Sequence, residues 1–164
     1  MPVPEEKFLS YYDRYADPIF RYCYYRLYQR RELAKEITQE TFLRAWELSR
    51  KEDVDNMRAL LYRVARNLII DYSRKKKEES MEELEEKGQV MSYDPSEHLF
   101  NTLECKQLIE QLDALETEYR DALLMRYVDG LKPREIAGIT GESVNVISVR
   151  ITRAKQAIRK IIEN

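Results

Sequence analysis

The side chains that most often carry catalysis or hold metals are scarce in this sequence. His98 is the single histidine among 164 residues, and the two cysteines, Cys23 and Cys105, lie far apart in apolar, helix-like segments. There is no CxxC pair to begin a zinc site and no GxxxxGK[ST] loop to hold a nucleotide phosphate. The sequence therefore predicts neither an enzyme nor a metal site, and it indicates no cofactor.

Residues suited to DNA do occur in the C-terminal third. A short segment from Pro133 to Ile139 and a longer basic segment from Val144 are separated by a turn with Gly141, in the outline of a helix-turn-helix. Ser143 suits the N-cap of the second helix. The side chains predicted to face inward are Ile136, Ala137, Ile147, Ile151, Ala154 and Ile158. An ordinary three-helix bundle with a solvated basic face has the same outline, so this segment alone leaves both interpretations open.

Two groups of side chains near this turn are candidates for DNA contact. Those predicted to lie near a major groove are Ser148, Val149, Thr152 and Arg153. Those better suited to phosphates are Lys132, Arg150, Lys155 and Arg159. Because the whole chain carries a net charge of −2, its distribution of charge is more informative than the sum.

The charges are arranged in blocks. Residues 58–77 hold seven basic side chains and one acidic, residues 78–86 hold six glutamates, and residues 132–160 hold seven basic and two acidic side chains. Two basic blocks thus flank an acidic one, which we interpret as a linker between two domains.

The sequence predicts an all-α fold of two small helical domains. Glycine and proline are few, and long segments are rich in Leu, Ala, Glu, Lys and Arg. The predicted parts are an N-terminal helical bundle over residues 1–77, an acidic linker over 78–97 and a C-terminal helix-turn-helix domain over 98–164. There is no apolar run of the length of a signal peptide or a membrane span, which favours a cytoplasmic protein without membrane insertion.

Three helix patterns organise the N-terminal domain. Asp17-Pro18 predicts a new helix start, because Asp favours the N-cap and Pro the first turn. A helix from Arg31 to Ser49 is predicted to carry its apolar stripe on Leu33, Ile37, Thr41, Ala45 and Leu48. A helix from Met57 to about Lys77 is predicted to carry Leu60, Leu61, Val64, Ala65, Leu68, Ile69 and Tyr72 on its apolar side.

Three long strings resemble one protein family. LAKEITQETFLRAW (33–46) and MRALLYRVARNLIIDYSRKKK (57–77) are similar to the second conserved domain of sigma factors of the extracytoplasmic-function (ECF) class. The string from Leu112 to Ile158 resembles the fourth sigma domain, in the same order and at the usual separation. The resemblance implies a protein that binds core RNA polymerase and directs promoter-specific initiation.

The resemblance also implies roles for individual residues. The residues matched to the surface that binds the clamp helices of the largest polymerase subunit are Glu36, Gln39, Glu40 and Leu43. Taken alone, this acid–amide patch is ordinary solvated surface. Lys35 stands where the family usually has an acid, which predicts an altered contact. The second domain is expected to meet the flap of the second-largest subunit.

For promoter DNA, the resemblance points to two regions. The residues matched to capture and contact of the melted minus-ten element are Asp53, Asn56, Arg63, Arg66, Asn67 and Arg74, with Met57 and Leu60 in place of the common Phe and Trp. Those matched to minus-thirty-five duplex DNA are Ser148, Val149, Arg150, Thr152 and Arg153. Asn145, Val146 and Ser148 replace the usual Gly, Thr and Lys or Arg, which predicts an atypical minus-thirty-five sequence or reduced affinity there.

Two functional alternatives remain at this stage. The first is a conventional dimeric helix-turn-helix regulator that binds DNA without core polymerase. The second, an enzyme, has no catalytic constellation to support it. Within the sigma interpretation, the acidic linker suits a path through the basic polymerase cleft, and a solvated tether explains it equally well. An anti-sigma factor is a further expected partner.

Overall fold

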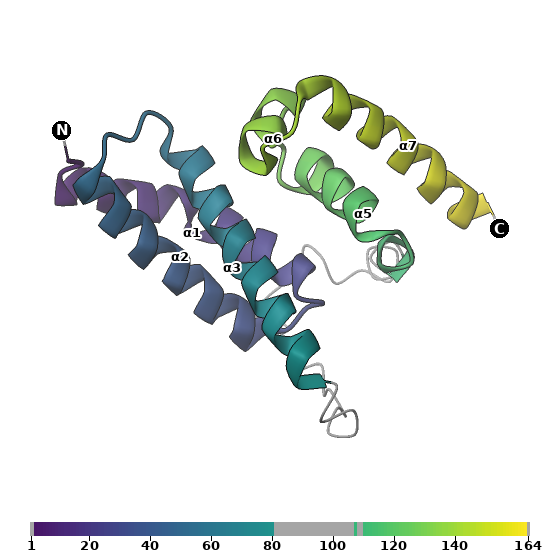
Figure 1. The fold of residues 1–164 in the computed structure, drawn as a ribbon, viewed down its shortest axis with the longest axis horizontal. Coiled ribbons are helices and arrows are strands. Elements are labelled where there is room, and N and C mark those ends of the chain that lie inside the picture. Colours follow the sequence, from purple (N-terminus) through teal and green to yellow (C-terminus); the bar gives the residue numbers. More distant parts are fainter. Residues whose placement is uncertain (1, 81–106, 108–109, 164) are drawn as a thin grey trace. The chain divides into compact units, whose positions relative to one another are not determined.

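The computed structural model describes residues 2–80, 107 and 110–163. Throughout these parts the regular secondary structure is helical and no strand occurs, so the all-α prediction is confirmed. The chain divides into two compact units, as predicted, and each is described by itself (Figure 1). The boundaries predicted for the linker stay predictions, because residues 81–106 lie outside the described residues.

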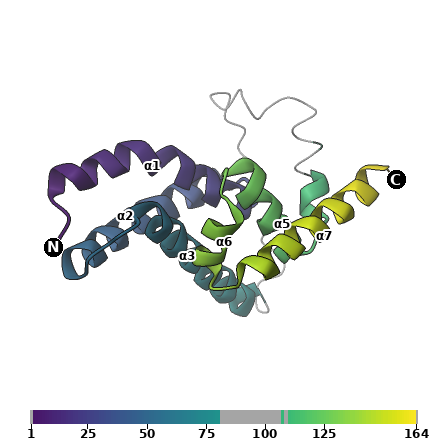
Figure 2. The ribbon, with the colours of Figure 1, turned by 90° about the horizontal axis from the view of Figure 1, so that it is seen from above.

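The first unit is a bundle of three helices, α1 (Glu5–Arg26), α2 (Arg31–Lys51) and α3 (Met57–Ser80), each in contact with the other two (Figures 1 and 2). Its largest fully buried side chains are Ile19, Tyr22, Cys23, Thr41, Ser49, Leu61 and Tyr62. The rings of Tyr22 and Tyr62 meet edge to face at 5.2 Å between centroids. The apolar stripe predicted for α3 is largely buried, and the buried side chains of this helix lie between Met57 and Ile69.

The helix break predicted at Asp17-Pro18 is wrong. α1 continues from Glu5 to Arg26 with Pro18 inside it. Phe8, Ile19 and Tyr22 are buried on both sides of the proline, at spacings that keep them on one face of a single helix. A proline costs a helix one backbone hydrogen bond, and burial of this continuous face against α2 and α3 outweighs that cost.

The stripe predicted for α2 is only partly confirmed. Thr41 and Ala45 are buried, whereas Leu33 and Ile37 are half-buried and Leu48 is exposed. The inward face is instead completed by Ala34, Thr38, Phe42 and Ser49. The hydroxyl groups of Thr38 and Thr41 donate to backbone carbonyls four residues earlier, at 2.6 and 2.7 Å. With their polar atoms satisfied within the helix, these short side chains let α2 pack closely against its neighbours.

The second unit contains the predicted helix-turn-helix. α5 (Thr117–Leu123) passes directly into a π-helical turn, η2 (Leu124–Val128), and is followed by α6 (Pro133–Thr140) and α7 (Val144–Glu163). Gly141 adopts a left-handed conformation, with φ of 79°, and ends α6. The side chains at the predicted core positions Ile136, Ala137, Ile147, Ile151 and Ala154 are buried, and Ile158 is half-buried.

Candidate functional surfaces

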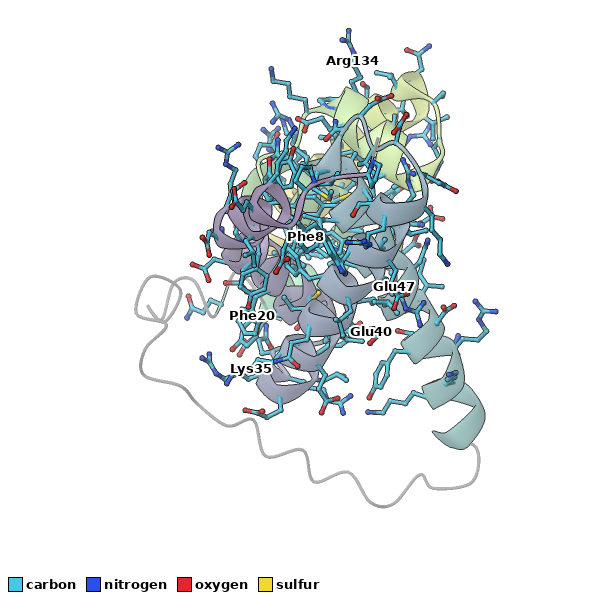
Figure 3. All side chains as sticks on the ribbon, turned by 90° about the vertical axis from the view of Figure 1, so that its left-hand side faces the viewer. Phe8, Phe20, Lys35, Glu40, Glu47 and Arg134 are labelled. Atoms are coloured by element: carbon cyan, nitrogen blue, oxygen red, sulfur yellow. The ribbon has the colours of Figure 1, made fainter. Side chains whose placement is uncertain are left out.

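The four residues matched to polymerase docking share the outer side of α2. Glu36 and Gln39 are exposed, and Leu43 is 58% exposed. The Glu40 carboxylate accepts a hydrogen bond from Arg44 Nε at 2.9 Å, on the surface. Lys35, Glu40 and Glu47 lie along the same helix (Figure 3). This face therefore combines two glutamates, of which Glu40 is paired with Arg44, with the exposed apolar residue Leu43.

An apolar groove of about 680 Å³ lies between α1 and α2, next to this face. Leu9 and Tyr12 of α1 form one wall, Gln39 and Leu43 of α2 form the other, and Glu5 and Trp46 complete the lining together with Phe8 and Phe42. The last two are buried, and Figure 3 marks Phe8 on α1. The ring of Phe8 lies 4.9 Å from that of Trp46, and the ring of Tyr12 lies 4.8 Å from that of Phe42. The groove floor is thus built from packed aromatic rings.

The α1 wall of this groove is a part of the site that sequence reasoning missed. Leu9 is 55% exposed and Tyr12 is 45% exposed, although both belong to a helix rich in buried aromatic residues. The resemblance directed attention to α2 alone. The exposure of these two side chains follows from how α1 packs against α2, which no local spacing in the sequence specifies.

The residues of α3 matched to the minus-ten element lie opposite its buried stripe. Arg63 and Asn67 are exposed and Arg66 is half-buried. Arg74 is exposed and forms a surface ion pair with Asp71 at 3.0 Å. Arg63, Asn67 and Arg74 are spaced by four and seven residues, so the helix brings them to one face.

The loop before α3 has a structural role at one predicted contact residue. The side-chain oxygen of Asn56 accepts a hydrogen bond from the backbone N–H of Ala59 at 3.0 Å, which makes Asn56 the N-cap of α3. Asn56 and Asp53 are both exposed. The cap fixes where the loop ends and the helix begins, so it also fixes how the loop is presented to a partner.

On α7, four of the five residues matched to minus-thirty-five DNA point outward. Ser148, Val149, Thr152 and Arg153 are exposed, as predicted. The Ser143 hydroxyl accepts a hydrogen bond from the backbone N–H of Val146 at 3.2 Å, which confirms the predicted N-cap. The start of α7 therefore presents short side chains, both polar and apolar, because Val144, Val146 and Val149 are exposed beside Ser148. The cation Arg153 follows further along the helix.

Arg150 differs from these four residues. Its two terminal nitrogens donate to the two carboxylate oxygens of Glu142 at 2.8 and 2.6 Å, and its side chain is only 18% exposed. The hydrogen-bonded Glu142 carboxylate raises the pKa of Arg150 above its ordinary value, although burial acts in the opposite direction. Glu118 of α5 lies 3.9 Å away. The structure thus separates Arg150 from the outward face of α7.

Other predicted features concern metals and membranes. Within residues 2–80, 107 and 110–163, no group of three or more His, Cys, Asp and Glu side chains is placed to hold a metal ion. No helix in that part of the chain is both long and apolar enough to cross a membrane. Cys23 is buried and not in a disulfide, whereas His98 and Cys105 lie outside the described residues.

Comparison with known proteins identifies the family. Residues 11–79 match the model of sigma-70 region 2, and residues 105–158 match that of sigma-70 region 4. The chain is 32% identical over 167 residues to the ECF RNA polymerase sigma factor SigW of Bacillus subtilis, covering 95% of this chain and 89% of that protein. The chain belongs to the ECF RNA polymerase sigma factors. Sigma factors are DNA-binding transcription initiation factors.

Two further proteins are similar to this sigma factor. It is 30% identical to the ECF sigma factor SigE of Mycolicibacterium smegmatis, over 89% of this chain and 58% of that protein. Its fold is similar to that of the sigma factor RpoE of Bartonella quintana, solved in complex with the anti-sigma factor NepR. That likeness has a TM-score of 0.80 at 19% identity and covers 96% of this chain and 98% of that one. The two helical units of this sigma factor correspond to regions 2 and 4.

Proposed function

We propose that this sigma factor docks on core RNA polymerase through the outer face of α2 and the adjoining groove, and positions α3 and α7 on promoter DNA. The observation that carries the proposal is the exposed apolar groove with acidic side chains beside it. An exposed apolar groove next to a folded core is typical of a protein-binding surface.

The groove suits an amphipathic helix with a basic flank. Leu9, Tyr12 and Leu43 offer apolar surface to such a helix, and Glu36 and Glu40 lie close enough along α2 to attract its cations. In core polymerase we assign this helix to the clamp helices of the largest subunit. The flap of the second-largest subunit is proposed as the partner of the second unit.

For the minus-ten element, the proposal uses the outer face of α3. Arg63 and Arg74 would hold the phosphates of the unstacked strand, and Asn67 would hydrogen-bond a base edge, with Arg66 at the margin. Asp53 and Asn56 would border the position of a flipped base. Capture of that base would offset part of the free energy of unstacking, which is roughly a few kcal/mol.

For the minus-thirty-five element, α7 would enter the major groove. Ser148, Val149 and Thr152 are short, so they would contact base edges only at close approach, while Arg153 would bind a phosphate or a guanine. Ser148 stands where the family usually has a cation. The affinity of α7 for this element would therefore depend less on charge and more on shape complementarity with the major groove.

Regulation is proposed to come from an anti-sigma factor. The chain shares its fold with a sigma factor whose solved structure contains an anti-sigma partner. We place this regulation, like the polymerase contact, in the cytoplasm. Isolation of the protein from uninduced cells, always free of any inhibitor, would contradict this part of the proposal.

The competing function is a dimeric regulator that binds DNA without core polymerase. Mixing the purified chain with core enzyme and resolving the products by gel filtration separates the two. The proposal predicts a one-to-one complex with core, and tight sequence-specific DNA binding only within that complex. A dimer that binds its operator tightly and leaves core unbound would contradict it.

A further inference from the structure

We infer that Arg150 positions α7 for DNA recognition, by holding Glu142 in the turn before the helix, and does not itself contact DNA. This inference rests on the proposed function, because it concerns the helix that we assign to the minus-thirty-five element. We call the bidentate pair the Arg150–Glu142 clasp.

The clasp lies on the buried side of α7. Arg150 follows Ile147 by three residues and precedes Ala154 by four, and both of those side chains are buried. Three- and four-residue spacings place residues on one helix face, so Arg150 borders the core. Arg153 follows Arg150 by three residues and is its neighbour on the helix surface, but it is exposed. The Arg150 side chain is only 18% exposed, so exposure distinguishes the two arginines.

The clasp joins the turn of the helix-turn-helix to the body of α7. Glu142 stands between Gly141, where the backbone reverses in a left-handed conformation, and Ser143, which caps α7. Two parallel hydrogen bonds from a planar guanidinium fix the distance and the angle between its partners. Glu118 extends the contact weakly to α5, because it lies 3.9 Å away and its side chain is 73% exposed.

Direct contact with a phosphate would disrupt this arrangement. Arg150 would have to give up two charge-assisted hydrogen bonds, and the phosphate would approach the carboxylate of Glu142. Arg153 faces no such obstacle, since it is exposed on the outward side of the same helix. The arginine that supplies charge to DNA and the arginine that orients the helix are therefore different residues.

The test compares Arg150→Lys and Glu142→Gln with Glu118→Gln as the charge-matched control. Each variant is assembled with core polymerase, and its affinity is measured for two duplexes over a range of salt concentrations. One duplex is a promoter fragment selected by run-off transcription with the wild-type protein, and the other is a random duplex of equal length. Both clasp variants are expected to lose about tenfold in affinity for the promoter fragment, the size of one good base contact. Their affinity for the random duplex and their salt slope should not change, and Glu118→Gln should resemble wild type.

A direct phosphate contact predicts the opposite pattern. Lysine also binds phosphates, so Arg150→Lys would keep its affinity, and Glu142→Gln would bind more tightly because a repelling carboxylate is gone. That pair of results would overturn the inference. A variant that is merely less stable would lose affinity for both duplexes together, so selective loss on the promoter fragment is the deciding observation.

A second measurement needs no DNA. In the free chain, amide hydrogen exchange at Val146 and Ile147 should be faster in Arg150→Lys and Glu142→Gln than in Glu118→Gln, because the turn is no longer held. Equal exchange in all three would overturn the inference. Failure of wild-type holoenzyme to prefer any promoter fragment would instead contradict the proposed function, while exchange would still report on the clasp.

Discussion

α3 and α7 carry the two surfaces for which promoter contact is proposed. Arg63 of α3 and Arg150 of α7 differ in where they lie relative to the buried side of their helix. Arg63 lies on the side of α3 away from the buried stripe and is exposed. Arg150 borders the buried stripe of α7 and is held by Glu142. A cation on a basic helix is therefore available to DNA only if its position relative to the core leaves its side chain exposed.

The largest expected effect concerns the α3 surface. Asn67→Ala should lower run-off transcription from duplex promoters by about ten- to a hundredfold, as a contact to one unstacked base contributes roughly 1–3 kcal/mol. Affinity for core polymerase should be unchanged, and a template with a pre-opened minus-ten region should recover much of the loss. Equal losses in transcription and core binding would refute the role assigned to Asn67.

The next-largest effect is expected at the groove between α1 and α2, where binding of core polymerase is proposed. Leu43→Ala should weaken binding to core enzyme by roughly tenfold, because the proposal makes Leu43 one of the minority of interface residues whose truncation costs more than about 1 kcal/mol. Leu48→Ala is the matched control, since Leu48 is an exposed leucine of the same helix that does not line the groove. Binding should be measured by fluorescence anisotropy of labelled sigma factor, and similar losses in both variants would argue against the groove.

A smaller effect sharpens the contrast within α7. Arg153→Ala should reduce the slope of log affinity against log salt by about 0.9, the share of one phosphate contact, with a loss of affinity that shrinks at high salt. The same titration of Arg150→Lys should leave the slope unchanged. If Arg153→Ala left the slope unchanged, Arg153 on the outward face of α7 would not contact a DNA phosphate.

The smallest expected effect separates the two roles of Asn56. Asn56→Ala removes the N-cap of α3 and should lower the free energy of unfolding by about 1 kcal/mol, measured by denaturant titration. Asn56→Ser keeps a capping hydroxyl and should restore that stability. Transcription that stays low in Asn56→Ser would assign this residue a DNA contact beyond the cap, whereas full recovery would limit it to the cap.

Much of the fold followed from the sequence because strong local patterns agreed with the packing. The helix-turn-helix was predictable from Gly141, Ser143 and the spacing of buried isoleucines, and all of these are confirmed. The continuity of α1 through Pro18 was not predictable, because the local helix-start signal at Asp17-Pro18 is outweighed by burial of side chains on both sides of the proline. The α2 stripe was predicted correctly at Thr41 and Ala45, but its large members Leu33, Ile37 and Leu48 are not buried. Small residues such as Ala34 and Ser49 take buried positions instead.

The candidate site was predictable where exposure follows from helix periodicity. Glu36, Asn67 and Thr152 are all exposed, as expected of outward positions. The ion pair of Arg150 depends on the path of the turn that brings Glu142 beside it, eight residues earlier, and no helical spacing specifies that path. The α1 wall of the groove likewise depends on how two helices pack, which only the assembled bundle reveals.

The most direct test of the central claim is run-off transcription with core RNA polymerase on a genomic fragment library. With the purified sigma factor, we expect core enzyme to initiate at a small set of reproducible start sites, and core alone not to do so. Absence of any such start site, on every template and at every salt concentration tried, would contradict the claim.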